Sequence, residues 1–186
     1  MAQTELKIAA VSDLHGQLPT IPPCDLLLIA GDVAPDRFYD AWARHAPSLQ
    51  AGWVRSTYEY WANHQPCAHV AGTWGNHDFC GQRGFTAPSM YVDRLVEVLG
   101  LRIWLTPWSR TFMDWAFMKS EDELRDIYAR IPEGIDILSK SRGYAAFTIT
   151  PSFKSCCWLA ASAPASSGAC PRRSYERHLR RDRQNE

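Results

Sequence analysis

Three short apolar runs in the first half of the chain each end in polar side chains. The runs are residues 6–11, 25–30 and 68–73, and they lead into Ser12-Asp13, Gly31-Asp32 and Gly75-Asn76-His77-Asp78. Runs of this length are typical of buried parallel strands, which are covered on both faces. Because the carboxyl ends of parallel strands meet at one edge of a sheet, we expect the three polar clusters to lie close together there.

Helices and strands are predicted to alternate through the rest of the first 138 residues. Aromatic residues between Phe38 and Trp61 indicate one or two helices, and further helices are expected over residues 89–99 and 121–131. Ser120 and Glu123 match the capping box that begins a helix, ahead of apolar side chains at helical spacing. Strands are expected over residues 101–105 and 135–138. This alternation predicts an α/β fold built in layers.

The character of the sequence changes near Ser139. Residues 155–171 carry no charged side chain and are rich in Ala, Ser and Cys, whereas residues 172–186 contain six arginines. No periodic pattern extends the α/β prediction through this part. We therefore divide the chain into a domain over residues 1–138 and an atypical tail over residues 139–186.

Composition limits the classes of protein to which the chain can belong. Its 186 residues suit one domain, and Lys+Arg and Asp+Glu both number 20, so no global field attracts nucleic acid or an anionic membrane. We interpret the Arg-rich tail as solvated and do not expect nucleic-acid binding. Glu5 and Lys7 interrupt any signal-like apolar segment, so we expect a soluble, cytoplasmic protein. Six cysteines without a CxxC pair are expected to be free thiols. The sequence does not indicate an oligomeric state.

The polar clusters contain the donors that divalent metals use. Carboxylate, amide and imidazole groups suit Mn²⁺, Fe or Zn²⁺, and Asp13 and His15, two positions apart at a strand end, project to the same side. Taken singly, Asp13 and Asp32 could cap helices and Asn76 could serve a turn. The three clusters in order favour metal ligation. The histidines at 45, 64 and 69 lie outside these clusters and are expected to be surface or packing residues.

These clusters resemble the pattern D-x-H, G-D, G-N-H-[DE] of the calcineurin-like metallophosphoesterase superfamily over roughly residues 7–138. The segments Thr106-Pro107-Trp108-Ser109, Asp114-Trp115-Ala116-Phe117 and residues 131–138 are similar to its small branch of metallophosphoesterase-domain-containing (MPPED) proteins. The resemblance implies a β-sheet sandwich flanked by helices. It also implies hydrolysis of a phosphomonoester or phosphodiester, such as a cyclic nucleotide, by a metal-activated hydroxide.

Carried over by position, the resemblance implies a role for each residue of the clusters. Asp13 and His15 would hold the first of two divalent ions, Asp32 would bridge them, and Asn76 would bind the second. His77 would protonate the leaving oxygen or steady the transition state, and Asp78 would orient His77. The partner implied is a small phosphoester or nucleotide.

The family pattern breaks after Leu138. A histidine in an H-G-P-P-like turn and a later G-H-x-H should follow, but the only histidine beyond Asp78 is His178. Loss of three imidazoles would remove most of the second ion's ligands. We hypothesise that the chain was cut, or its reading frame displaced, near Ser139, so that the fold is incomplete at its C-terminus. The alternative to an active enzyme is an impaired remnant that binds metal or phosphate weakly.

Overall fold

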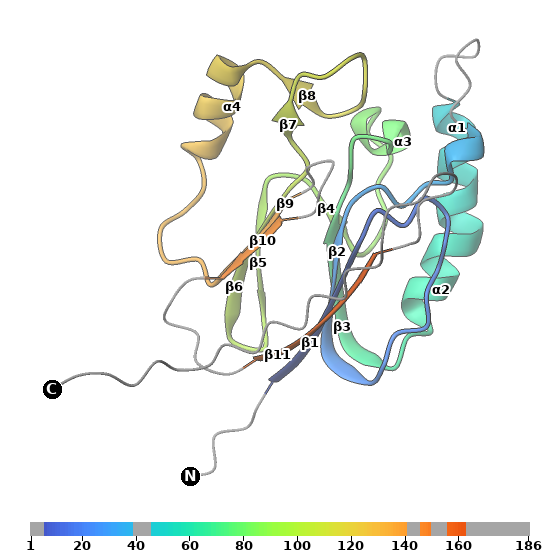
Figure 1. Cartoon of the computed structure of the whole chain (residues 1–186), viewed down its shortest axis with the longest axis vertical. Coiled ribbons are helices and arrows are strands. Elements are labelled where there is room, and N and C mark those ends of the chain that lie inside the picture. The colour runs from blue at the N-terminus through green and yellow to red at the C-terminus, as the bar shows by residue number, and fades with distance from the viewer. Residues whose placement is uncertain (1–5, 39–45, 141–145, 150–155, 163–186) are drawn as a thin grey trace, which may run out of the picture.

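Two large β-sheets pack face to face, with helices outside them, in a computed structural model of the chain (Figure 1), and the two short strands β7 (Ser109–Arg110) and β8 (Met118–Lys119) form a third sheet. The structure describes residues 6–38, 46–140, 146–149 and 156–162, the last two ranges as backbone only. The α/β sandwich expected from the sequence is confirmed.

The first sheet has the order β11-β1-β2-β3-β4, and all of its neighbouring strands are parallel. The bounds of its strands are β1 Leu6–Ser12, β2 Cys24–Ala30, β3 Cys67–Thr73, β4 Met90–Tyr91 and β11 Cys156–Ser162. The three strands predicted from the apolar runs are thus confirmed. Because β1, β2 and β3 run in the same direction, their carboxyl ends, with the polar clusters, lie at one edge.

The second sheet has the order β10-β9-β6-β5. Its strands are β5 Arg94–Val98, β6 Leu101–Thr106, β9 Ile137–Lys140 and β10 Ala146–Ile149. The predicted strand at 101–105 is confirmed, but the helix predicted over residues 89–99 is wrong. Leu99 and Gly100, with φ of 54° and 79°, close a tight turn that folds β5 back on β6 as a hairpin.

The helical segments from α1 to α3 lie along the outer face of the first sheet, whereas α4 lies on the side of the second sheet (Figure 1). The helices are α1 Pro47–Trp53, a π-helical turn Val54–Tyr58, α2 Glu59–Asn63, α3 Phe79–Gln82 and α4 Glu121–Tyr128, and a 3₁₀ turn spans Asp36–Phe38. The helical segment predicted between Phe38 and Trp61 and the capped helix after Ser120 are confirmed. Gln50, Val54, Tyr58 and Ala62 recur every four residues and are all buried. This spacing gives the α1–α2 segment one continuous buried face.

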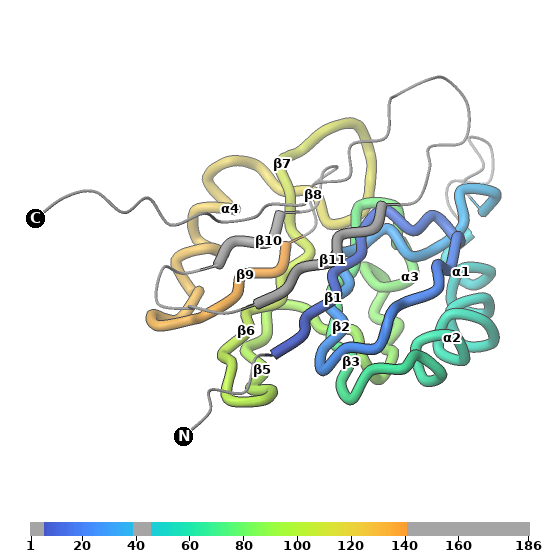
Figure 2. Tube along the Cα trace, turned by 60° about the horizontal axis from the view of Figure 1, so that its bottom comes forward, coloured from blue at the N-terminus to red at the C-terminus, as the bar shows by residue number. Residues whose placement is uncertain are grey.

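Alternation along the central strands divides the core in two. Ala9, Val11, Leu27 and Ile29 face the helices, whereas Ile8, Ala10, Leu26 and Leu28 face the second sheet, where they meet Ile103, Leu105 and Ile137. Figure 2 shows β1, β2 and β3 between α1–α2 on one side and β5, β6 and β9 on the other. Burial of each Leu or Ile side chain stabilises the fold by about 1.5–3 kcal/mol. The strands that lead into the polar clusters are therefore firmly held in the core.

Two strands come from the segment beyond Ser139, where the sequence predicted no regular element. β10 pairs antiparallel with β9, and β11 pairs parallel with β1 along all seven of its residues, from Leu6↔Cys156 to Ser12↔Ser162. Residues 163–186, including His178 and the Arg-rich stretch, lie outside the described part of the chain. The hypothesis of a displaced reading frame stays a prediction.

Cys24 and Cys67 form a disulfide, so the expectation of free thiols is wrong for this pair. The two residues are direct partners at the start of β2 and β3, with Cα atoms 4.8 Å apart. Their separation of 43 residues along the chain hides this proximity. Cys80 is a free, buried thiol, as expected. None of the helices in the described ranges is long and apolar enough to cross a bilayer.

Candidate metal centre

The loops after β1 and β2 bring three of the predicted ligands together. One ligand atom from each of Asp13, His15 and Asp32 lies within 4.8 Å of the others. Leu14, between the first two, is fully buried in the core. Asp13 and His15, on either side of Leu14, therefore present their side chains to one site, as predicted.

All three of these residues have left-handed backbone conformations, with φ of 51° at Asp13, 46° at His15 and 52° at Asp32. Asp and His are among the non-glycine residues that adopt this region most readily, yet each such residue still carries strain. The backbone N–H of His15 donates to the carbonyl of Asp32 at 2.7 Å, which ties the two loops together. The surrounding fold thus enforces the conformation that turns these side chains toward one another.

The third loop, after β3, is fastened to Asp32 from two sides. The backbone N–H of His77 donates to Oδ1 of Asp32 at 2.8 Å. Gly75 is packed so closely on Asp32 that a Cβ added to it would lie 2.8 Å from the carboxylate carbon. Only a glycine allows this approach. Asn76, with 2% of its surface exposed, therefore lies at the same edge as the other predicted ligands.

Asp78 joins the loops after β2 and β3. Its fully buried carboxylate accepts hydrogen bonds from the backbone N–H groups of Val33 at 3.2 Å, Ala34 at 2.9 Å and Gly75 at 2.7 Å. Such bonds to a carboxylate are among the stronger hydrogen bonds in proteins. The orienting of His77 by Asp78, implied by the family resemblance, stays a prediction, whereas its part in holding the loops is direct.

Gln50 holds the same loop from α1. Its Nε2 donates to the carbonyl of His77 at 2.7 Å, and its Oε1 accepts from the backbone N–H of Cys80 at 3.0 Å. The side chain is 2% exposed, so it supplies a buried partner to the N–H of Cys80 and a second one to the carbonyl of His77, which also accepts from the N–H of Phe79 at 3.2 Å. The loop that carries Asn76 and His77 is thus fixed by both the sheet and the helix layer.

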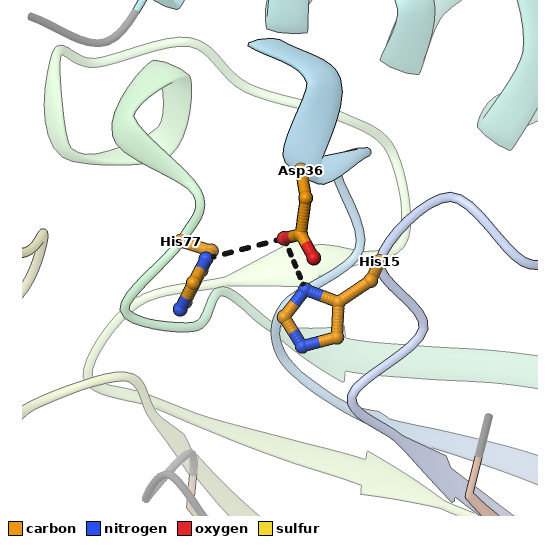
Figure 3. A group of neighbouring side chains, drawn as sticks. All are labelled: His15, Asp36 and His77. Atoms are coloured by element: carbon orange, nitrogen blue, oxygen red, sulfur yellow. Dashed lines mark hydrogen bonds and ion pairs between the residues drawn. The ribbon is translucent and has the colours of Figure 1, made fainter. Parts of the chain in front are cut away.

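Asp36 is a member of the site that the sequence reasoning missed (Figure 3). Its Oδ1 lies 2.7 Å from Nδ1 of His15 and 3.4 Å from Nδ1 of His77. The two imidazole rings are 4.8 Å apart between centroids and nearly perpendicular. Histidines that bind metals commonly donate their other ring nitrogen to a carboxylate, and Asp36 is placed to do this for His15. The one signal in the sequence was an aspartate four residues after Asp32.

Burial dominates the electrostatics of the site. It raises the pKa of the carboxyl groups of Asp32 and Asp78 above their ordinary value, and in Asp78 the charge of Asp32 adds to this rise. The pKa of His77 is lowered, first by burial and then by His15. Keeping these two carboxylates charged therefore costs free energy, and a bound cation would lower that cost.

The donors present fit a divalent ion. Within the described ranges, no Lys or Arg forms an ion pair with Asp13, Asp32 or Asp78. The buried Nδ2 of Asn76 also has no hydrogen-bond partner there, and a half-turn of the amide group would put its oxygen in the same place. Two carboxylates, an imidazole and an unsatisfied amide form the hard, mixed oxygen and nitrogen set that Mn²⁺, Fe and Zn²⁺ accept.

A family model described as calcineurin-like phosphoesterase matches residues 6–130 of the chain. The protein belongs to this family. A comparison with curated proteins found no match. The more specific resemblance to the MPPED branch stays a prediction.

The sequence contains neither H-G-P-P nor G-H-x-H, the motifs that the family resemblance implies after Leu138. Of its other histidines, His64 and His69 are exposed, and Nδ1 of His64 contacts the carbonyl of Tyr60 at 2.7 Å, in agreement with a surface role. His45 and His178 lie outside the described residues. The predicted ligands of a first ion thus lie together in the structure, whereas only Asp32 and Asn76 among the predicted ligands are assigned to a second ion.

Proposed function

We propose that this protein is a metal-dependent phosphoesterase that hydrolyses a small phosphomonoester or phosphodiester, including nucleotides. The observation that carries the proposal is the convergence of Asp13, His15 and Asp32, with the ring of His77 beside that of His15. A divalent ion held there supplies Lewis-acid chemistry, since it lowers the pKa of water and offsets charge on phosphoryl oxygens. Mn²⁺ is the ion we would test first.

The chain's own residues then have separate tasks. His77 is half-buried beside the predicted ligands and is the residue positioned to transfer a proton to the leaving oxygen. Asp36 contacts both His15 and His77 from one oxygen, which restricts the orientation of the two rings. Gln50 and Asp78 hold the loop from which His77 projects. Together these contacts preorganise the site before a substrate arrives.

The second candidate function is a remnant that binds metal or phosphate weakly without efficient turnover. It is favoured by the absence of H-G-P-P and G-H-x-H from the sequence, which would leave the second ion poorly coordinated. Both candidates share the first-ion site, so they differ in turnover rather than in the first binding step.

Titration calorimetry with Mn²⁺ tests the binding of the first ion, which both candidate functions require. Asp32→Ala should abolish binding, whereas Asp122→Ala, which removes an exposed aspartate on α4, should leave it unchanged. Equal Mn²⁺ affinity for wild type and Asp32→Ala would overturn the site. Hydrolysis of bis-p-nitrophenyl phosphate then separates the candidates. Turnover that falls in His77→Ala supports the enzyme, and binding without turnover supports the remnant.

A cytoplasmic location remains part of the proposal. The Cys24–Cys67 disulfide favours an oxidising compartment instead, because such bonds are rare in the cytosol. Alkylation of free thiols in intact cells, followed by mass spectrometry, would decide. Modified Cys24 and Cys67 would support the cytoplasm, and an intact bridge would oppose it.

A further inference from the structure

The loop between β7 (Ser109–Arg110) and β8 (Met118–Lys119) is attached directly to the candidate site. The backbone N–H of Ala116 donates to the carbonyl of Asn76 at 2.9 Å. Ala116 and Phe117 are buried in the core that faces the helices. The base of this loop is therefore as firmly placed as the metal-site loop that it contacts.

The tip of the same loop exposes large apolar side chains. Phe112 is 60% exposed and Met113 is 65% exposed. Met113 at the tip and Phe117 at the base have left-handed backbones, with φ of 56° and 54°, so strain is stored at both ends of this segment. Strained backbone conformations occur more often at functional sites than elsewhere. Exposed apolar patches likewise often mark binding sites.

Successive ring contacts connect the tip of this loop with His77, the candidate proton donor. The ring of Phe112 lies edge-on to that of Trp115, with centroids 5.4 Å apart, and Trp115 lies 4.7 Å from the ring of His77. The indole Nε1 of Trp115 is buried without a hydrogen-bond partner among the described residues. An unpaired buried donor is costly, which favours a site that a ligand oxygen completes.

We infer that Phe112 and Trp115 form an aromatic shelf that binds a planar aromatic ring carried by the phosphoester. This inference rests on the proposed function, because the shelf recognises the organic part of the ester while the metal centre takes its phosphoryl group. Aromatic side chains stack on planar rings whatever substituents these rings carry. Edge-to-face and offset ring contacts add stabilisation beyond that from burying apolar area. A phosphoester of an alkyl alcohol cannot make these contacts.

Binding of two phosphonates, which cannot be hydrolysed, tests the shelf by calorimetry with saturating Mn²⁺. Phenylphosphonate should bind wild type roughly three- to tenfold more tightly than methylphosphonate. Phe112→Ala should remove this preference, and Phe112→Tyr should retain it. Tyr60→Ala is the matched control, because Tyr60 is an aromatic residue of α2 that is 65% exposed and stacks on His64 rather than near His77. It should leave the preference intact.

The outcomes separate the shelf from the proposed function. Equal affinity of the two phosphonates for wild type would overturn the shelf and leave the metal centre standing. Failure of both phosphonates to bind would overturn the proposed function and the shelf with it. AMP and ribose 5-phosphate form a second pair. A Phe112-dependent preference for AMP assigns the shelf to a nucleobase, and a preference confined to the phenyl compound assigns it to aryl esters.

Discussion

Gly75 is in direct contact with the side chain of Asp32, with no space between them for a further carbon atom. The contact places the loop after β3 on the residue predicted to bridge two ions. The geometry of the site therefore depends on a residue that has no side chain of its own.

Substitution Gly75→Ala should displace Asp32 and weaken Mn²⁺ binding by about tenfold or more, the range seen when groups that orient metal ligands are changed. The measurement is calorimetric titration with Mn²⁺. Gly52→Ala is the matched control, because a Cβ there meets nothing within 4 Å and Gly52 lies within α1. Unchanged affinity in Gly75→Ala would show that Asp32 is not constrained by this contact.

Gln50→Ala should destabilise the protein by about 1–3 kcal/mol, because the N–H of Cys80 would lose its buried partner and the carbonyl of His77 would keep only the bond from Phe79 at 3.2 Å. Urea unfolding followed by circular dichroism gives the free energy of unfolding. Gln65→Ala removes a half-buried amide just after α2 that donates at 2.7 Å to the carbonyl of Trp61. This variant should lower the free energy of unfolding clearly less than Gln50→Ala does. Equal losses would contradict the role assigned to Gln50 in holding the loop after β3.

Glu123 should make stability depend on pH at the acid end. Hydrogen bonds from Lys119 and then from Ser120 lower the pKa of Glu123 from 4.5 to about 2 in the folded protein. Because the folded pKa lies below the unfolded one, this stabilisation is present above pH 4.5 and is lost as the pH falls toward 2. The difference in Tm between wild type and Glu123→Gln should therefore shrink between pH 6 and pH 2.5.

Glu97→Gln, which removes an exposed carboxylate from β5, is the control for this experiment. A difference between wild type and Glu123→Gln that stays constant down to pH 2.5 would show that the charge of Glu123 is not responsible.

Reduction of the Cys24–Cys67 disulfide should lower the free energy of unfolding by about 2–4 kcal/mol, since the bridge restricts the unfolded chain between β2 and β3. Urea unfolding with and without dithiothreitol measures the change. The double variant Cys24→Ala/Cys67→Ala is the control and should no longer respond to the reductant. An equal response in that variant would assign the effect to other thiols.

The sequence predicted the elements whose signals are local. The apolar runs of β1, β2 and β3, and the Ser120–Glu123 capping box, carry their information within a few residues, so these predictions were confirmed. The helix over residues 89–99 failed because the turn at Leu99–Gly100 was not recognised. That turn lets the partly apolar segment of β5 pair with β6 rather than continue as a helix.

The missed features of the site and of the cysteines depend on contacts between distant segments. Asp36 follows Pro35 in a short 3₁₀ turn, and only the folding of three loops against one another brings it to His15 and His77. Cys24 and Cys67 meet because β2 and β3 pair in one particular register, and neither cysteine lies in a motif that indicates it. Pairing and loop contact are tertiary properties, which local patterns do not determine.

The three backbone hydrogen bonds accepted by Asp78 have a consequence for the motions of the site. The amides of Val33, Ala34 and Gly75 belong to two loops, yet one buried carboxylate binds all of them. The loops must therefore open together, and only when the carboxylate is released, so these amides should exchange their hydrogens for deuterium slowly and at similar rates. Chelation of the metal would leave this protection in place, because the loops are joined by the protein rather than by the ion.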